Sequence, residues 1–327
     1  MYNILVTGVG AIIGYGIIRS LHTSRYPVKI VGMDIYSDAV GQNWCDNFEK
    51  AILASVPEYP EFIKNVIQKY QIDLVIPGIE QDIMRMAKES NNFQDFNTKF
   101  VLNNLELLTV ADDKWLTHLK LLSAGFPTIK TYIDGSYSKL SEELGVPFLL
   151  KPRKSYASKG IFKLYNEEDF LYWKNKLGDN FMVQEIVGDD NSEYTVGLFG
   201  FGDGTSSHKL IFQRKLSGEG ATVKAKVRII PELDNVVDRL VKVFKPIGPT
   251  NLQFRYHQGQ YLLLEINPRI SSSTSLRTAF GFNDAEMCIL YYLEGLKPQY
   301  QEIRMGYAVR YIEDMIIYDS DTCRCPR

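Results

Sequence analysis

Short apolar runs alternate with amphipathic stretches along the first third of the chain. Four runs have the length and composition of buried strands; they cover residues 3–8, 28–34, 72–78 and 98–103. Three stretches between them space their apolar residues three or four positions apart, which is typical of helices that bury one face; they cover residues 11–24, 57–70 and 80–90. Strands that alternate with helices predict a parallel, doubly wound α/β sheet that ends at about residue 110.

The alternation stops there, and an α+β pattern with hairpins follows. Asp112 or Asp113 can cap a helix whose apolar positions include Trp115, Leu119 and Leu122. The later apolar runs are separated by polar turns, as in antiparallel sheets. Four of these runs cover residues 181–185, 193–199, 251–256 and 261–266.

Composition limits the class of protein. The chain has 327 residues, of which 45% are hydrophobic, and a formal charge of -2, which predicts two or three domains. Lys and Arg nearly balance Asp and Glu without a basic tract, so no nucleic-acid partner is expected. The first residues lack a leader pattern, and no run approaches the roughly 20 apolar residues that span a bilayer, so we expect a cytoplasmic protein without a membrane partner. The cysteines have neither disulfide nor zinc spacing and are expected to be thiols; they are Cys45, Cys288, Cys323 and Cys325.

A glycine-rich turn follows the first expected strand. Gly8, Gly10 and Gly14 have the spacing GxGxxxG, which differs from the GxGxxG of dinucleotide-binding proteins. Asp34 nevertheless lies about 20 residues beyond Gly14, where NAD enzymes have an acid that binds ribose. An NAD-dependent sugar-nucleotide oxidoreductase is therefore one alternative, and a tight strand-to-helix turn that exposes N–H groups to an anion is the other.

A basic loop follows the apolar run that ends at Lys151. It contains Arg153, Lys154, Lys159 and Gly160 and leads into another strand. A hairpin of this kind can close over phosphates, because lysine supplies a point charge and glycine lets the backbone approach. A solvated turn is the alternative.

Two carboxylates flank the next turn. Glu185 ends one expected strand, Glu193 begins the next, and Ile186 and Val187 form an apolar hinge after the first. A nucleotide base can stack against such a hinge while Glu193 accepts hydrogen bonds from ribose hydroxyls. Alternatively, both acids are surface charges at strand ends.

The hairpin near the C-terminal end carries the most specific chemical signal. Side chains alternate along a strand, so Glu265 and Asn267 share one face, and Gln253 on the partner strand can join them. Mg²⁺ prefers one or two such oxygen ligands together with water and substrate phosphates. Pro268 ends the strand, and Arg269 then offers a planar guanidinium that suits a phosphoryl or carboxylate group.

Taken in this order, the motifs resemble those of the ATP-grasp superfamily, especially the members similar to the carbamoyl-phosphate synthase large subunit and to biotin carboxylase. The resemblance covers nearly the whole chain and is most specific at the stretch LQF followed by LLLEINPR. It implies a pre-ATP-grasp domain at residues 1–110 and a two-lobed ATP-grasp domain with antiparallel sheets. The lid subdomain is expected at 111–187 and the C-terminal subdomain with the metal site at 188–327.

The resemblance also implies roles for individual residues. The implied ATP-binding residues are Lys114, Lys151, Lys159, Gly160, Glu185, Ile186, Val187 and Glu193. The implied ligands of Mg²⁺, with Mn²⁺ as an alternative, are Gln253, Glu265 and Asn267. The implied catalytic residues are Arg269, Lys151 and Arg214. Lys114 departs from relatives that often carry arginine, which keeps the charge but loses the bidentate geometry.

The activity implied is that of a carboxylate–amine ligase. A carboxylate attacks the γ-phosphate of ATP to give an acyl phosphate and ADP, and an amine then displaces phosphate to form an amide. The expected partners are small-molecule carboxylates and amines, such as an amino acid or a sugar acid. Because the chain has one core, carbamoyl phosphate and carboxybiotin are not the expected products. An ATP-binding module without turnover is a further alternative, and a homodimer is one option for the assembly.

Several residues are candidates for contact with the substrates. They are Gly10, Glu80, Gln81, Arg214, Lys215, Ser272 within the run Ser271 to Ser275, and Arg277. Each has a simpler interpretation: the serine run can be an ordinary polar loop, Arg277 can pair with a carboxylate, and Glu80 with Gln81 can cap a helix.

Overall fold

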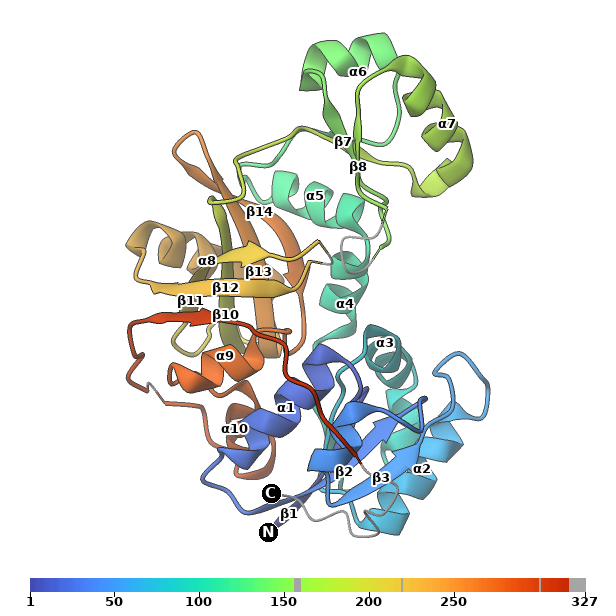
Figure 1. The fold of residues 1–327 in the computed structure, drawn as a ribbon, viewed down its shortest axis with the longest axis vertical. Coiled ribbons are helices and arrows are strands. Elements are labelled where there is room, and N and C mark those ends of the chain that lie inside the picture. The colour runs from blue at the N-terminus through green and yellow to red at the C-terminus, as the bar shows by residue number, and fades with distance from the viewer. Residues whose placement is uncertain (156–159, 219, 300, 318–327) are drawn as a thin grey trace.

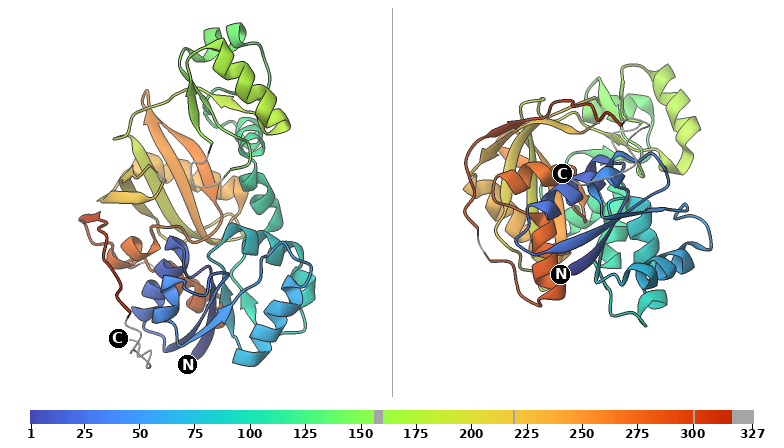
Figure 2. Two further views of the ribbon diagram at one scale, coloured as in Figure 1. Left: turned by 45° about the vertical axis from the view of Figure 1, so that its right-hand side comes forward. Right: turned by 60° about the horizontal axis from the view of Figure 1, so that its bottom comes forward.

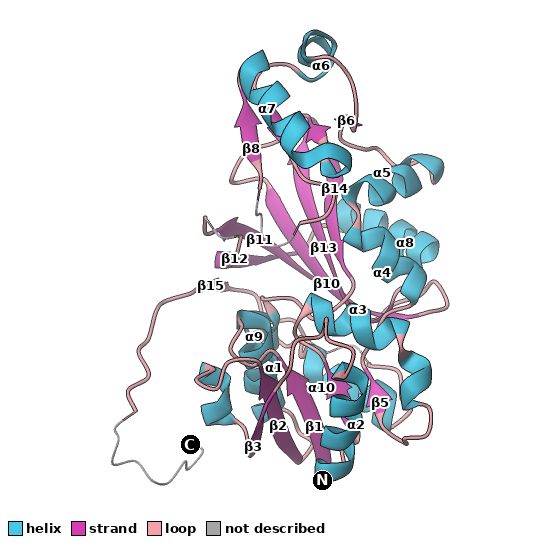
Figure 3. Ribbon diagram, turned by 90° about the vertical axis from the view of Figure 1, so that its right-hand side faces the viewer, coloured by secondary structure: helices cyan, strands magenta, loops and turns pink. Residues whose placement is uncertain are grey.

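The computed structural model describes residues 1–155, 160–218, 220–299 and 301–317. It consists of a parallel sheet at one end, a six-stranded antiparallel sheet in the middle and a small sheet with two helices at the other end (Figure 1). Figure 2 shows the same arrangement from two further directions, and Figure 3 shows the six-stranded sheet rising from the parallel sheet towards the small one.

The first sheet is parallel and doubly wound, as predicted. Its strand order is β3-β2-β1-β4-β5. The strands are β1 (Tyr2–Thr7), β2 (Val28–Asp34), β3 (Asn47–Lys50), β4 (Leu74–Ile76) and β5 (Lys99–Phe100), and the helices are α1 (Ile12–His22), α2 (Tyr59–Tyr70) and α3 (Glu80–Lys88), with short turns η1 (Val40–Trp44) and η2 (Ser90–Phe93). The sequence did not predict β3, because its residues NFEK contain no apolar run. This composition is possible because β3 lies at the edge of the sheet.

Both faces of this sheet are covered. Leu5 and Val75 point to one face and pack with Ile63 of α2, whereas Ile4 and Val6 point to the other and pack with α1. Strands that are buried on two sides need apolar residues at successive positions, which is why they read as continuous runs.

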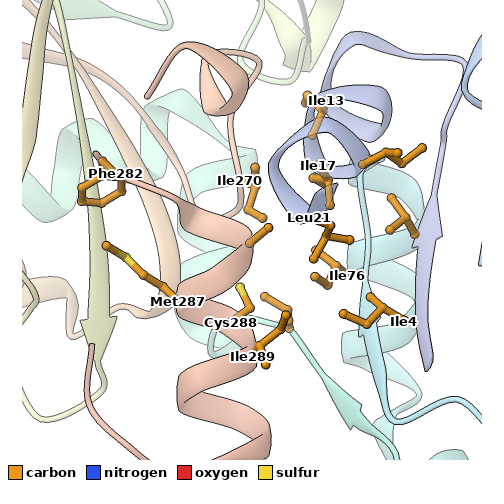
Figure 4. Packing of buried hydrophobic residues seen from close by; sticks show 14 of the residues in the cluster. Ile4, Ile13, Ile17, Leu21, Ile76, Ile270, Phe282, Met287, Cys288 and Ile289 are labelled. Atoms are coloured by element: carbon orange, nitrogen blue, oxygen red, sulfur yellow. The ribbon is translucent and has the colours of Figure 1, made fainter. Parts of the chain in front are cut away.

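A C-terminal segment completes the α1 side of the first sheet. It contains α9 (Thr274–Ala279), α10 (Asp284–Cys288) and the π-helical turn η4 (Ile289–Leu293). Figure 4 shows Ile17 and Leu21 of α1 facing Cys288 and Ile289, and all four are nearly inaccessible to solvent. One apolar core therefore joins residues from both ends of the chain, and the boundaries at 110 and 187 remain predictions.

The central sheet has the strand order β14-β13-β10-β11-β12-β15. Its strands are β10 (Glu193–Phe201), β11 (Leu210–Leu216), β12 (Thr222–Arg228), β13 (Ile247–His257), β14 (Gln260–Asn267) and β15 (Tyr307–Val309). The helix α8 (Pro231–Phe244) covers one face through Leu233 and Val237. The predicted hairpin between β13 and β14 is confirmed, and its turn uses Gln258 and Gly259 at positive φ angles of 47° and 83°.

The third part is a four-stranded antiparallel sheet, which we call the lid. Its strands, in the order β6-β9-β7-β8, are β6 (Thr131–Tyr132), β9 (Val183–Gln184), β7 (Phe148–Leu150) and β8 (Phe162–Leu164). It is covered by α6 (Tyr137–Leu144) and α7 (Glu167–Leu177), the latter followed by η3 (Gly178–Asn180). Phe148, Phe170 and Phe181 form an aromatic core between these layers.

Two helices, α4 (Leu105–Asp112) and α5 (Lys114–Ser123), lead from the first sheet to the lid. Asp113 caps α5 by accepting a hydrogen bond from the Trp115 N–H, as one predicted option had it. The predicted apolar face of α5 is wrong, since Leu119 and Leu122 are 42% and 50% exposed. Leu121 instead joins the core that α8 forms with the central sheet, because that core is what packs against α5.

In the part of the chain that the structure describes, no helix is long and apolar enough to cross a membrane. Cys45 and Cys288 are free thiols, as expected. Cys323 and Cys325 lie outside the described residues.

The shared core predicts a large cost for truncating α1. We expect Leu21→Ala to lower the free energy of unfolding by about 2–5 kcal/mol, because Leu21 is 1% exposed between the two segments. Leu122→Ala is the matched control, since Leu122 lies half exposed on α5, and it should cost less than about 1 kcal/mol. Urea titrations of both variants measure the difference. Equal effects of the two substitutions would contradict the shared core.

Candidate active site

The polar residues of the β13–β14 hairpin lie on the face of the central sheet opposite α8. Gln253 stands directly opposite Glu265, and Asn267 follows two residues further along β14. The register shifts between Gln253 and Phe254, so that Leu264 is an extra residue on β14. Glu265 and Asn267 nevertheless share one face, and the three predicted metal ligands are brought together.

The donor set fits a hard cation that is held mainly by substrate phosphates. It offers one carboxylate and two amide oxygens, and Asn267 is 8% exposed. Glu265 forms no ion pair within 4.0 Å with any residue that the structure describes, so its oxygens are available. Among the described residues there is no group of three His, Cys, Asp or Glu side chains that could hold a metal. Amide oxygens and an external phosphate would therefore have to complete the coordination.

Arg269 joins this set to the first sheet. Its Nε donates to Glu80 Oε1 at 2.9 Å, and its Nη2 donates to Asn267 Oδ1 at 3.0 Å. Glu80 is the first residue of α3, directly beyond the carboxyl end of β4. The predicted substrate residue Glu80 thus holds the predicted catalytic residue Arg269, and an anion that binds Arg269 competes with this ion pair.

Two lysines face Glu265 from the lid side. Lys114, at the start of α5, donates to the carbonyl and hydroxyl oxygens of Ser155 at 3.0 and 3.1 Å. Lys151, at the end of β7, is only 9% exposed. Burial lowers the pKa of Lys151 to about 8, against the opposing effect of the Glu265 carboxylate. Burial lowers the pKa of Lys114 as well, again opposed by Glu265. Both cations are therefore held where an anionic ligand would stabilise them.

One cation of the basic loop after β7 is used in an ion pair within the protein. Arg153 binds the Asp113 carboxylate with two hydrogen bonds, of 3.2 Å from Nε and 2.6 Å from Nη2. Gly160 has a φ of 77°, which favours glycine at the point where the chain turns back into β8. Lys159 lies outside the described residues. The pairing of Arg153 ties the beginning of the loop to the first turn of α5. Among the described residues here, Lys114 and Lys151 interact electrostatically with Glu265.

An apolar cluster forms at the hinge after β9. The Glu185 N–H donates to the Lys130 carbonyl, and Val187 is 4% exposed and packs against Leu262 and Leu264. Leu262 and Leu264 are two residues apart on β14, so both face the hinge. Ile186 is half-buried beside them. This apolar surface lies next to Glu265 along the chain and suits a flat aromatic ring.

Glu193 lies between two arginines at the open end of the sheet. It is 3% exposed, and its two oxygens accept from Arg214 Nη2 at 3.2 Å and Arg255 Nη2 at 2.9 Å. Arg214 also donates to Thr222, but its Nε is buried without a partner in the described structure. Glu193 is thus no surface charge. Arg255 received no role from the sequence, although it stands two residues beyond Gln253 on the same face.

Arg277 pairs with a carboxylate inside the protein, which was the simpler alternative to a contact with the substrate. It is 1% exposed and donates from Nε to Asp284 Oδ2 at 3.0 Å and from Nη1 to Asn251 Oδ1 at 3.1 Å. A Cβ at Gly197 would lie 2.5 Å from Arg277 Nη1, so glycine lets the guanidinium pack against β10. Arg277 therefore packs against β10 and β13, the strands that carry Glu193 and Gln253.

The serine run is also mostly buried. Ser271 and Ser273 are 6% and 1% exposed, and Ser273 is 3.1 Å from the Thr222 hydroxyl. The Ser272 carbonyl accepts a hydrogen bond from Arg310, which directly follows β15. No pattern in the sequence indicated Arg310, because β15 is a three-residue edge strand that only the tertiary fold brings to this loop. Lys215 is exposed on the other face of the sheet.

A large cavity opens along the carboxyl edge of the first sheet. Its volume is 1060 Å³, and its lining includes Gly10, Glu80 and Gln81. A second cavity of 50 Å³ is lined by Glu80 together with Glu265 and Arg269. The predicted substrate residues of the first domain therefore line a space that adjoins the polar face of the hairpin.

Asp34 serves the glycine turn itself. Its Oδ2 accepts from the Gly10 N–H at 2.8 Å and its Oδ1 from the Tyr36 N–H at 3.0 Å. A Cβ at Gly14 would lie 2.1 Å from the Gly8 carbonyl oxygen, so these glycines are needed for close packing of α1 on β1. The turn is explained without a dinucleotide, which leaves the NAD alternative without support.

Comparison with known proteins agrees with this geometry. Residues 179–315, which contain β10 to β15, match a family model described as ATP-grasp in the biosynthetic pathway with Ter operon. The predicted resemblance to the ATP-grasp superfamily is thus confirmed for residues 179–315.

Relatives of several kinds match part of the chain. The carbamoyl phosphate synthase large chain of Deinococcus radiodurans is 23% identical over 269 residues, which are 73% of this chain and 26% of that one. A formate-dependent phosphoribosylglycinamide formyltransferase of Prochlorococcus marinus is 32% identical over 68% of this chain and 62% of its own. The chain thus spans about a quarter of the length of the synthase relatives.

Solved structures of other proteins share the fold of this chain. The N5-carboxyaminoimidazole synthetase of Staphylococcus aureus, complexed with ADP, superposes with a TM-score of 0.73 at 18% identity, covering 93% of this chain and 80% of that one. The predicted fold class, a parallel sheet followed by antiparallel sheets, is confirmed.

The buried cation at position 151 predicts a pH-dependent stability. An unfolded lysine keeps its proton to about pH 10.5, whereas folded Lys151 loses it near pH 8. Between these values the unfolded chain binds more protons, so the free energy of unfolding rises with pH. We expect Lys151→Met to be more stable than the wild type below pH 8 by up to roughly 3 kcal/mol, with the gap closing towards pH 10.5.

Lys154→Met is the matched control, because the Lys154 side chain in the same loop is 61% exposed. Urea titrations of the wild type, Lys151→Met and Lys154→Met at several pH values measure their free energies of unfolding. A difference between wild type and Lys151→Met that is constant with pH would contradict the buried charge.

Proposed function

We propose that the protein is an ATP-dependent carboxylate–amine ligase that forms an amide through an acyl phosphate and releases ADP and phosphate. The observation that carries the proposal is the meeting of Gln253, Glu265 and Asn267 with the buried cation Lys151 and with Arg269. An oxygen-donor cluster surrounded by lysine and arginine suits the transfer of a phosphoryl group, which needs mainly positioning and neutralised charge.

In this proposal each part of the site has one task. The hinge at Val187, with Leu262 and Leu264, holds the adenine ring, and Lys114 and Lys151 neutralise the phosphates. Mg²⁺, when bound, supplies charge neutralisation and Lewis acidity at the phosphoryl oxygens. Glu193 reaches the ribose hydroxyls only by sharing its oxygens with Arg214 and Arg255.

Arg269 is the residue proposed to act on the transferred group. Its guanidinium is held by Glu80 and Asn267, and all three residues line the small cavity. There it can bind the substrate carboxylate and then the phosphoryl group as that carboxylate attacks. The overall reaction converts a carboxylate, an ammonium compound and ATP to an amide, ADP, phosphate and one proton.

The loop after β7 is proposed to exclude water from the acyl phosphate. Lys114 and Asp113 hold its beginning through Ser155 and Arg153. A closed loop protects the intermediate, because an acyl phosphate in water is hydrolysed. The contacts at Ser155 hold the beginning of this loop against α5.

For the carboxylate we propose a small molecule such as an amino acid or a sugar acid. The matching family description refers to a biosynthetic pathway, and the name of the Prochlorococcus relative includes a small carboxylate, formate. An ATP-binding module without turnover is the second candidate, but it has no need for all three oxygen ligands and Arg269 together.

The proposal predicts which products form from ATP. With Mg²⁺, pooled carboxylates and pooled amines, phosphorus NMR should record ADP and phosphate only when both pools are present. Hydroxylamine in place of the amines should give a hydroxamate, which reports the acyl phosphate. Glu265→Ala should lower the rate at least about 100-fold, because the central carboxylate is lost.

Glu302→Ala is the matched control, since Glu302 is exposed far from the hairpin in sequence, and it should leave the rate unchanged. Formation of AMP and pyrophosphate, or ATP turnover that survives in Glu265→Ala, would count against the proposal.

Lys151 predicts that ATP binding takes up protons. In the free protein its pKa lies at about 8, and neighbouring phosphates would raise it. At pH 8.5 binding should therefore take up part of a proton, and the affinity should fall as the pH rises further. Calorimetry of Mg·ATP binding in phosphate and Tris buffers measures the uptake. Lys151→Arg should bind with less uptake, because arginine stays protonated; equal buffer dependence of the two proteins would contradict the assignment.

A further inference from the structure

The large cavity of the first domain adjoins the proposed centre of reaction. It runs along the carboxyl ends of β1, β2 and β4, the edge at which parallel sheets bind ligands. Its lining shares Glu80, Met84 and Asp112 with the small cavity, which reaches Glu265 and Arg269. A molecule in the large cavity can thus extend a reactive group to the proposed acyl phosphate.

The charge of the lining is mostly negative. Five carboxylates contribute to it against two basic residues; the carboxylates are Asp34, Asp38, Glu80, Asp82 and Asp112, and the bases are Arg85 and Lys88.

Some of these charges are offset by ion pairs with residues outside the lining. Glu80 pairs with Arg269, and Asp112 lies 3.8 Å from Lys154. Arg85 pairs with Glu89 at 2.7 Å. The charges without such an ion pair are those of Lys88 and of three carboxylates, Asp34, Asp38 and Asp82. The lining therefore keeps a net negative potential. Burial raises the pKa of Asp82, which weakens its share but does not change the sign.

The walls between these charges are apolar. They include Ile35, which is 38% exposed, and Leu53, which is 55% exposed, as well as Ile52 and Met84. Exposed large apolar side chains that gather at one cavity mark a binding surface. A ligand that fits this lining carries a positive charge and an apolar body.

We propose that this cavity binds the amine substrate, and that this substrate is a non-phosphorylated ammonium compound with an apolar body. The assignment rests on the proposed function, which it deepens by naming the class of the amine. The substrate carboxylate would approach Arg269 from the side of the serine run and Arg214.

The second step balances for such a substrate. The acyl phosphate and the ammonium compound give the amide, hydrogen phosphate and one proton. The new bond joins the nitrogen to the acyl carbon, and the bond from that carbon to the bridging oxygen breaks. One proton leaves the ammonium group before attack, another leaves as the amide forms, and phosphate carries one of them away.

A phosphorylated amine does not fit the lining. Arg85 is held by Glu89 and by the Ala54 carbonyl at 3.2 Å, and Lys88 is exposed. A phosphate group in the cavity would face three carboxylates with one available cation. The phosphorylated compound in the name of the Prochlorococcus relative, phosphoribosylglycinamide, therefore differs in class from the amine proposed for this chain.

Equilibrium binding of two simple amines tests the proposal. Calorimetric titration of the full chain with n-hexylamine should give saturable binding, whereas O-phosphoethanolamine should not bind. Asp38→Lys should weaken hexylamine binding about five- to tenfold, because it reverses one charge of the lining. Asp38 is exposed and forms no ion pair with any residue of the described structure, so the fold should tolerate the change.

Asp95→Lys is the matched control, since Asp95 is exposed in the same domain outside the cavity, and it should leave hexylamine binding unchanged. Binding of Mg·ADP should be the same in all three proteins, which verifies that each is folded. Tighter binding of O-phosphoethanolamine than of hexylamine, no hexylamine binding, or equal effects of the two substitutions would overturn the assignment.

Hydroxylamine separates this proposal from the proposed function. Hydroxylamine is too small to need the cavity. If a hydroxamate forms but the protein does not bind hexylamine in preference to O-phosphoethanolamine, the amine site alone is overturned. Absence of both hydroxamate and ADP with every carboxylate would overturn the proposed function instead.

Discussion

The burial of α1 between two segments from opposite ends of the chain fixes the geometry on which the site depends. One side of α1 covers the parallel sheet, and the other packs against α10 and η4 (Figure 4). The same apolar cluster reaches Phe199 and Phe212 on the central sheet. Because packed interiors are not continuously deformable, this contact sets the distance between the carboxyl edge of the first sheet and the polar face of the second.

That fixed distance lets residues from three parts of the fold meet. Glu80 comes from the start of α3 beside the first sheet, Arg269 from the end of β14, and Lys151 from the lid. None of the pairs among them is local in sequence, so each depends on the arrangement of the sheets. The lid is joined to the rest by α4, α5 and the hinge after β9, and Arg153 with Asp113 ties its loop to the start of α5.

The polar face of the central sheet is costly to build. Arg277 and Asp284 are each 1% exposed, and Glu193 lies between two arginines, so several charges have left water. Buried ion pairs repay this desolvation poorly, and hydrophobic residues of similar size are often more stable. Such a network is better explained by specificity and by function. Gly197 shows how closely it is packed, because only the absence of a Cβ admits the Arg277 guanidinium.

The sequence by itself determined the local structure and the chemistry of the hairpin. Continuous apolar runs predicted the parallel strands, and the alternation of Glu265 and Asn267 put two oxygen ligands on one face, since both patterns follow from strand geometry alone. Only the tertiary structure decided which charges meet. It paired Arg277 with Asp284, placed Glu193 between Arg214 and Arg255, and brought Arg310 to the serine run, because each of these contacts joins different helices, strands or loops whose packing the sequence pattern does not reveal. It also turned Leu119 and Leu122 to solvent, since the side of a helix that is buried depends on what packs against it.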